Sequence, residues 1–132
     1  MKEIDKIAFI EIQEGKILST KSKGKTKYYI PGGKREIGES DLETLSREVF
    51  EELSVIVLPD TAEYIGAFSA QSDGAKKGVN VVMRCYKAKY SGTLKASNEI
   101  EEIRWLSYND FEIISEVDKK IFSFLKKNGE LK

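Results

Sequence analysis

The sequence predicts an α/β or α+β domain in which strands alternate with two main helices. Short runs rich in Ile, Val, Phe and Tyr recur along the chain, separated by glycine, proline or polar residues, as is typical of strands. Two segments, 41–53 and 117–127, instead place apolar residues at helical spacing. The chain has 132 residues, a length that suits one domain with its own core, so we expect residues 1–132 to form a single domain.

The N-terminal part is expected to begin with two strands. Residues 6–13 are rich in Ile and Phe, and a second apolar run follows at 17–20. Glu14-Gly15-Lys16 lies between them and is typical of a short hairpin turn. We therefore expect 6–13 and 17–20 to pair as a hairpin.

The next segment, 21–27, is polar and carries four lysines around a glycine. Charge runs of this kind usually form a solvated loop, and that interpretation is favoured here. The alternative is that Lys21 or Lys23 steers a polyphosphate into a site. Lys34, which follows a pair of glycines, is a third candidate for substrate binding.

A short strand is expected at 28–30, ended by Pro31. Gly32 and Gly33 follow directly. Because neither residue has a Cβ, the backbone can approach a ligand closely at this point.

The helix that follows has a clear start and an unusual end. Ser40 or Asp41 can cap it, and Glu43 lies three residues after Ser40, as a capping box requires. The apolar spacing carries the helix to about Leu53. Ser54 comes next, at a position that often adopts a left-handed conformation, where a residue other than glycine costs ~1 kcal/mol.

The second half of the chain predicts further strands and one more helix. Strands are expected at 55–58, 64–69 and 79–90, where apolar residues dominate. The polar segment 71–78 either forms a loop over a substrate or is an ordinary connection between strands. The closing helix is expected near 117–127.

Composition excludes several kinds of chemistry. The chain has 22 basic and 22 acidic residues, so a net charge of zero does not favour nonspecific binding to nucleic acid or to an anionic membrane. It has no histidine and one cysteine, Cys85, within an apolar run, which excludes Cys/His zinc sites, disulfides and a histidine base. No apolar run suits a signal peptide or a membrane span, so a cytoplasmic location is expected. Catalysis would have to rest on carboxylates and a metal ion.

One face of the first helix carries a cluster of carboxylates. At about 100° per residue, Glu48, Glu51 and Glu52 fall within an arc of roughly 100°, separate from the arc that holds the leucines and valine of the same helix. No lysine lies between residues 40 and 55 to balance them. Carboxylates this close repel one another, and Mg²⁺ or Mn²⁺ would neutralise them with the oxygen ligands that these ions prefer.

The segment 32–55 resembles the signature of the Nudix hydrolases. Gly33 is followed after five residues by Glu39, and after seven more by Arg47-Glu48-Val49-Phe50-Glu51-Glu52-Leu53-Ser54-Val55. The family pattern is met at every fixed position except the last glycine, which is Ser54 here. The resemblance implies the Nudix fold, an α/β/α sandwich with a mixed β-sheet between helices.

The resemblance also implies roles for individual residues. Metal ligands would come from the glutamate face and from one backbone carbonyl, and they are Gly32, Glu48, Glu51 and Glu52. Glu51 or Glu52 would also serve as general base. Arg47 and Glu39 would orient the ligand carboxylates.

A further glutamate is expected from the acidic segment 97–105, because Nudix domains commonly carry such a segment ahead of an aromatic-bearing strand. Glu99 is the first candidate to reach the metal site or act as base, and Glu102 is the second. The alternative, solvated acids before a strand, has equal weight.

The activity that the resemblance implies is Mg²⁺-dependent hydrolysis of the pyrophosphate linkage in a nucleoside diphosphate joined to another group, by a monomer or a homodimer. A nucleoside triphosphate, a nucleotide sugar and a 5′-triphosphate RNA end all stay open as substrates. The competing hypothesis is a Nudix-like module that binds a nucleotide without hydrolysing it and regulates a partner.

Overall fold

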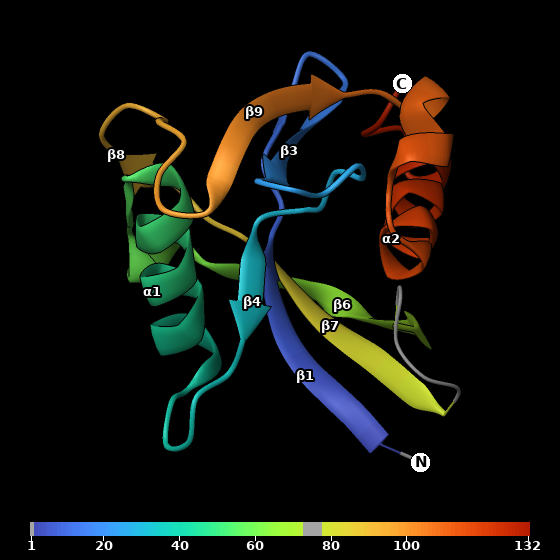
Figure 1. Ribbon diagram of the computed structural model, residues 1–132. Helices are drawn as coiled ribbons and strands as arrows, with labels where there is room; N and C mark the ends of the chain where they lie inside the picture. The colour runs from blue at the N-terminus through green and yellow to red at the C-terminus, as the bar shows by residue number, and fades with distance from the viewer. Residues whose placement is uncertain (1, 73–77) are drawn as a thin grey trace.

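The computed structural model describes residues 2–72 and 78–132 (Figure 1). In chain order the elements are β1 (Lys2–Phe9), β2 (Ile12–Gln13), β3 (Lys16–Ser22), β4 (Gly32–Lys34), α1 (Asp41–Leu53), β5 (Ile56–Val57), β6 (Glu63–Gln71), β7 (Val79–Lys87), β8 (Tyr90–Ser91), β9 (Ile100–Leu106) and α2 (Glu116–Lys127), with short 3₁₀ helices at Pro59–Thr61 and Tyr108–Ile113.

The strands form a mixed sheet and two smaller antiparallel sheets. The mixed sheet has the order β4-β1-β7-β6, in which β1 and β7 are parallel and the other neighbours antiparallel. The second sheet has the order β2-β3-β9, and β5 pairs with β8. Figure 1 shows α1 and α2 on opposite sides of these sheets. The predicted α/β fold with a mixed sheet between helices is therefore confirmed.

The core consists of two apolar clusters on opposite sides of β1. Successive side chains of a strand point to opposite faces. Ile7 and Phe9 accordingly pack with the apolar stripe of α1, which consists of Leu45, Val49 and Leu53. Ala8 packs on the other side, in a cluster that contains α2 residues Ile121, Phe122 and Leu125. Each helix thus buries the stripe that its sequence spacing predicted.

The predicted N-terminal hairpin is correct only at its turn. Ile12 pairs with Ile17 in the short β2–β3 ladder, but β1 lies in the other sheet, between β4 and β7. A central strand is buried on both faces, and the run from Ile7 to Ile10 has that pattern. The apolar run 6–13 is therefore two strands rather than one.

The short strand near Pro31 is also shifted from its predicted place. Residues 28–30 make only isolated bridges, while β4 begins after the proline, at Gly32. A Cβ on Gly32 would lie 2.0 Å from the carbonyl oxygen of Ile7, so only glycine lets the chain pair with β1 here.

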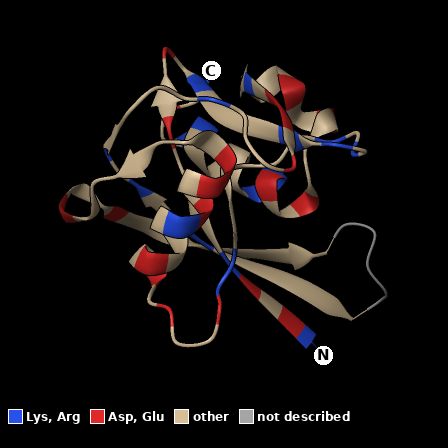
Figure 2. Cartoon of the chain, turned by 60° about the vertical axis from the view of Figure 1, so that its left-hand side comes forward, with Lys and Arg blue, Asp and Glu red and all other residues tan. Residues whose placement is uncertain are grey.

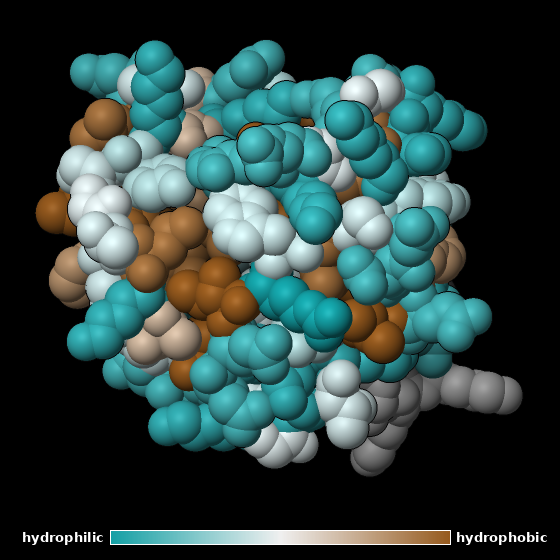
Figure 3. Space-filling model, turned by 90° about the horizontal axis from the view of Figure 1, so that it is seen from above, coloured by the Kyte–Doolittle hydropathy of each residue, from teal (hydrophilic) through white to brown (hydrophobic). Residues whose placement is uncertain are grey.

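The later strands agree with the sequence in type and differ at their ends. The run expected at 79–90 is divided into β7 and β8. The predicted loop 71–78 falls largely on residues 73–77, outside the described residues. The face drawn in Figure 3 is largely hydrophilic, with apolar side chains between polar ones. Neither of the two described helices has the length and apolar character needed to span a bilayer.

Candidate active site

Local sequence places α1 and fixes both of its ends. The hydroxyl of Ser40 accepts a hydrogen bond from the backbone N–H of Glu43 at 3.2 Å, and Glu43 Oε1 accepts one from the N–H of Ser40 at 2.8 Å. This confirms the predicted capping box. At the other end Ser54 has φ 62°, so the predicted left-handed conformation is also confirmed.

The guanidinium group of Arg47 donates hydrogen bonds to both Glu39 and Glu48. Its Nε and Nη2 donate to the two carboxylate oxygens of Glu39 at 2.7 and 2.9 Å, and its Nη1 donates to Glu48 at 2.8 Å. Nη2 also donates to the backbone carbonyl of Lys34 at 3.1 Å. Hydrogen bonding by Arg47 lowers the pKa of Glu39 to about 2. The arginine therefore ties the loop before α1 to the acidic face of the helix. Figure 2 colours the acidic positions along the chain red and the basic ones blue.

Glu52 is the most buried carboxylate of the cluster, with 7% of its surface exposed. Its Oε1 accepts a hydrogen bond from the backbone N–H of Gly32 at 3.1 Å. Burial is the main reason that the pKa of Glu52 is raised to about 8; the negative charges of Glu48 and Glu99 act in the same direction, and the Gly32 bond and the charge of Lys6 oppose them. The metal-free site therefore favours the protonated form of this carboxyl group.

Gly33 and Glu48 show how closely the glycine turn approaches the helix. A Cβ on Gly33 would lie 2.5 Å from the carboxylate of Glu48, which leaves no space for a side chain. Burial raises the pKa of Glu48, Arg47 lowers it, and Glu51 and Glu99 raise it. Glu51 is the most exposed of the three motif glutamates and lies 3.5 Å from Arg47 Nη1.

Glu99 reaches this cluster because the loop before β9 docks on the end of α1. The N–H groups of Lys95 and Ser97 donate to the last carbonyls of the helix, at 2.9 and 3.1 Å, and Asn98 Nδ2 donates to the carbonyl of Glu51. These bonds satisfy helix-end carbonyls that have no partner within the helix. The negative charge of Glu99 acts to raise the pKa of both Glu48 and Glu52, whereas Glu102 pairs in register with Lys21 on β3.

The three candidate lysines do not gather at one place. Lys21 forms an ion pair with Glu101, with Nζ and Oε2 2.8 Å apart. The backbone N–H of Lys23 donates to the carbonyl of Glu99 at 2.8 Å, so the backbone of Lys23 borders the acidic cluster. Lys34 is exposed, and its carbonyl is held by Arg47.

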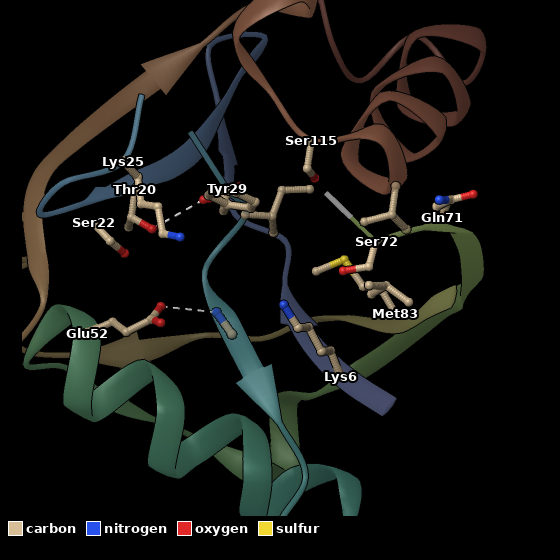
Figure 4. A pocket seen from close by; sticks show the side chains of 14 residues that line it. Lys6, Thr20, Ser22, Lys25, Tyr29, Glu52, Gln71, Ser72, Met83 and Ser115 are labelled. Carbon is tan, nitrogen blue, oxygen red and sulfur yellow. Dashed lines mark hydrogen bonds between the residues drawn. The ribbon is translucent and has the colours of Figure 1, made fainter. Parts of the chain in front are cut away.

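A cavity of about 300 Å³ opens beside Glu52 and Gly32 (Figure 4). Lys6, Lys25 and Tyr29 line it together with apolar residues of β7, Val81 and Met83. Neither lysine was a candidate on sequence grounds. The sequence does contain a signal for Lys6, because it alternates with the apolar residues Ile4 and Ala8 and so points to the same face of β1 as they do.

The acidic cluster fits a divalent cation in charge and in ligand chemistry. Its oxygen donors suit Mg²⁺ or Mn²⁺. Burial is the main cause of the raised pKa values of Glu48 and Glu52, and the charges of neighbouring glutamates act in the same direction, so a cation would be favourable among them. The side chains do not converge as placed, because Glu48 turns toward Arg47 and Glu52 toward Gly32. Among the described residues, no three acidic, cysteine or histidine side chains form a preassembled metal site.

A scan against protein families matches the NUDIX domain over residues 4–126. The chain belongs to the Nudix family. No curated protein sequence matches it. Among solved structures, this Nudix chain is similar to the ORF135 protein of E. coli, with 26% identity, a TM-score of 0.73 and coverage of 96% of this chain and 92% of that one.

Two further solved structures are similar to this chain. The mutator MutT protein from Bacillus halodurans has 30% identity and a TM-score of 0.69, with 91% of this chain and 80% of that chain covered. A NUDIX hydrolase from Nitrosomonas europaea has 19% identity and a TM-score of 0.75, with 98% and 92% covered, and shows the fold alone.

Proposed function

We propose that this Nudix protein is a pyrophosphohydrolase that cleaves the phosphoanhydride of a nucleoside diphosphate linked to a further phosphate or other group, with Mg²⁺ or Mn²⁺ as cofactor. The observation that carries the proposal is the buried carboxylate of Glu52, which lies beside Gly32 at the edge of the 300 Å³ cavity and close to the charges of Glu48 and Glu99. A cluster of acids next to a ligand-sized cavity is a typical hydrolytic site.

The residues divide into ligands and residues that orient them. Glu48, Glu51 and Glu52 would hold the metal with the carbonyl of Gly32, and the cation when bound would polarise the phosphate oxygens. Arg47 donates to Glu39 and Glu48 and thereby fixes the direction of the ligand carboxylates.

The proton of the attacking water requires a base within the same cluster. Glu52 lies at the edge of the cavity and is our first candidate. Glu51 and Glu99 are the other carboxylates near enough to take part, since Glu51 lies on the same helix and the charge of Glu99 acts on Glu52.

The cavity supports a nucleotide as the substrate. Val81 and Met83 provide an apolar wall, and Thr20, Ser22 and Ser115 add hydroxyl groups that can bond a base or a sugar. A volume of about 300 Å³ lies at the lower end of the usual range for small-molecule sites. The cavity therefore suits one nucleoside whose phosphates extend toward Glu52.

The test is a panel of nucleoside triphosphates, nucleotide sugars and 5′-triphosphate RNA, each assayed with Mg²⁺, with Mn²⁺ and after exhaustive EDTA treatment. Phosphorus NMR of the products identifies the bond that is cleaved. We expect hydrolysis of at least one member that depends on the divalent cation. Activity that survives EDTA would refute the metal mechanism, and tight binding without turnover would favour a nucleotide-binding regulatory module.

A further inference from the structure

Two lysines lie directly opposite each other on the side of the mixed sheet that faces away from α1. Strands β1 and β4 are antiparallel, and Lys6 pairs with Lys34 in register. Opposite residues of such a pair point to the same face, with their Cβ atoms about 5 Å apart. The adjacent pair, Ile7 and Gly33, points to the α1 side, where Ile7 packs with the helix and Gly33 lies against Glu48.

Like charges placed opposite each other in a sheet destabilise it. Neither ammonium group forms an ion pair with any residue in the ranges 2–72 and 78–132. The other face of the same sheet is balanced, because Asp5 Oδ2 bonds Arg35 Nε at 2.8 Å, Asp5 Oδ1 bonds Arg84 Nη1 at 2.6 Å, and Arg35 also pairs with Asp41. The sheet thus pairs its charges on one face, whereas on the other face two ammonium groups lie opposite each other and Lys6 faces, across the cavity, the carboxylate of Glu52, whose pKa it lowers.

Lys6 borders the cavity at the point where its acidic and apolar parts meet. On β7, Met83 is its register partner, and both residues line the cavity with Glu52. Figure 4 shows the ammonium group of Lys6 directed into the cavity, with Glu52 on one side and Met83 on the other. A ligand that spans from the apolar wall to the acidic cluster would therefore pass this ammonium group.

We propose that Lys6 and Lys34 form a cationic pair that binds the substrate phosphate nearest the nucleoside. This inference rests on the proposed function and names two binding residues for it. Phosphate oxygens accept hydrogen bonds from an ammonium group, and lysine acts toward them as a compact positive charge. A bound phosphate would also offset the repulsion between the two lysines. Ligand binding therefore gives a reason for a like-charge pair that does not stabilise the sheet.

The experiment measures binding of inorganic pyrophosphate by calorimetry, in EDTA and at low ionic strength. Lys6→Met and Lys34→Met should each weaken binding about 10-fold, the loss of one charge-assisted contact. Lys6→Arg should keep most of the affinity, since it restores the charge. Lys2→Met is the matched control, because Lys2 lies on the same strand and face, is exposed, and should stay within about twofold of the wild type.

Thermal melts separate a binding role from a structural one. Lys6→Met should melt within a few degrees of the wild type, because it removes both the repulsion from Lys34 and the attraction to Glu52. A lower melting temperature together with unchanged affinity would show that Lys6 serves the fold instead. On the substrate found by the panel, Lys6→Met should raise KM more than it lowers kcat.

The proposal and the proposed function can fail separately. Pyrophosphate binding in EDTA does not require turnover, so a weakened Lys6→Met with no hydrolysis of any substrate would support the pair and refute the enzyme. Hydrolysis with an unchanged KM and an unchanged pyrophosphate affinity in Lys6→Met would overturn the pair and leave the enzyme. Absence of binding by the wild-type protein at millimolar pyrophosphate would also overturn it.

Discussion

Glu52→Gln should remove a pH-dependent loss of stability from the metal-free protein. The carboxyl of Glu52 has its pKa raised from 4.5 to about 8, mainly by burial. Between these two values the folded protein keeps a proton on Glu52 that the unfolded chain releases, so stability must fall as the pH rises through this window. At about 1.4 kcal/mol for each pH unit between the two values, the loss by pH 9 is on the order of 5 kcal/mol.

The assay is a series of thermal melts from pH 5 to pH 9 in EDTA. For a chain of 132 residues, a loss of this size lowers the wild-type melting temperature by roughly 15 °C across the series. Glu52→Gln keeps the shape of the side chain and cannot ionise, so most of this decline should disappear. A smaller slope should persist, because burial also raises the pKa of Glu48, with Glu51 and Glu99 raising it further.

The control is Glu43→Gln on the same helix. Glu43 is exposed in the capping box, and glutamine keeps an oxygen that accepts the N–H of Ser40. This variant should show the full wild-type slope. An equal slope in Glu52→Gln would refute the burial argument, because the titrating group would then lie elsewhere.

The same variant tests catalysis. Turnover at saturating Mg²⁺ should fall by at least ~10²-fold in Glu52→Gln, a loss of a few kcal/mol of transition-state stabilisation, and should be nearly normal in Glu43→Gln. Added Mg²⁺ should raise the melting temperature of the wild type at pH 8 and do so much less in Glu52→Gln, because one ligand charge is absent. Near-normal turnover of Glu52→Gln would remove this helix face from the mechanism.

Substitutions at three further positions test the supports of the site. Arg47→Lys cannot give both of its hydrogen bonds to Glu39, so kcat should fall at least ~10-fold with little change in melting temperature, and an unchanged kcat would contradict the orienting role. Ser54→Gly should be about 1 kcal/mol more stable than Ser54→Ala in urea unfolding, because only glycine adopts φ 62° without strain; equal stabilities would count against that reasoning. Asn98→Gly keeps the left-handed backbone and loses the bond to Glu51, so kcat should drop several-fold while Asn98→Ala also loses stability; wild-type kcat in both would argue against anchoring by this residue.

The sequence alone determined the helix that carries the acidic cluster. Its capping box links Ser40 and Glu43, and its apolar stripe recurs at helical spacing, so both depend on contacts within a few residues. The family pattern implied that Arg47 and Glu39 orient the ligand carboxylates, and the ion pair between them spans eight residues. The spacing of the motif residues therefore predicts most of the side-chain arrangement on α1, because a helix fixes the relative positions of nearby side chains.

Only the tertiary structure decided which residues surround the cluster. The burial of Glu52 depends on Gly32 from another element, and the cavity combines Lys6 of β1 with Met83 of β7, residues that β-pairing brings together. Lys21 was a reasonable candidate by charge, yet the β3–β9 sheet places it in an ion pair with Glu101. Pairing of distant strands depends on which faces are buried in the whole chain, and a local window of sequence does not contain that information.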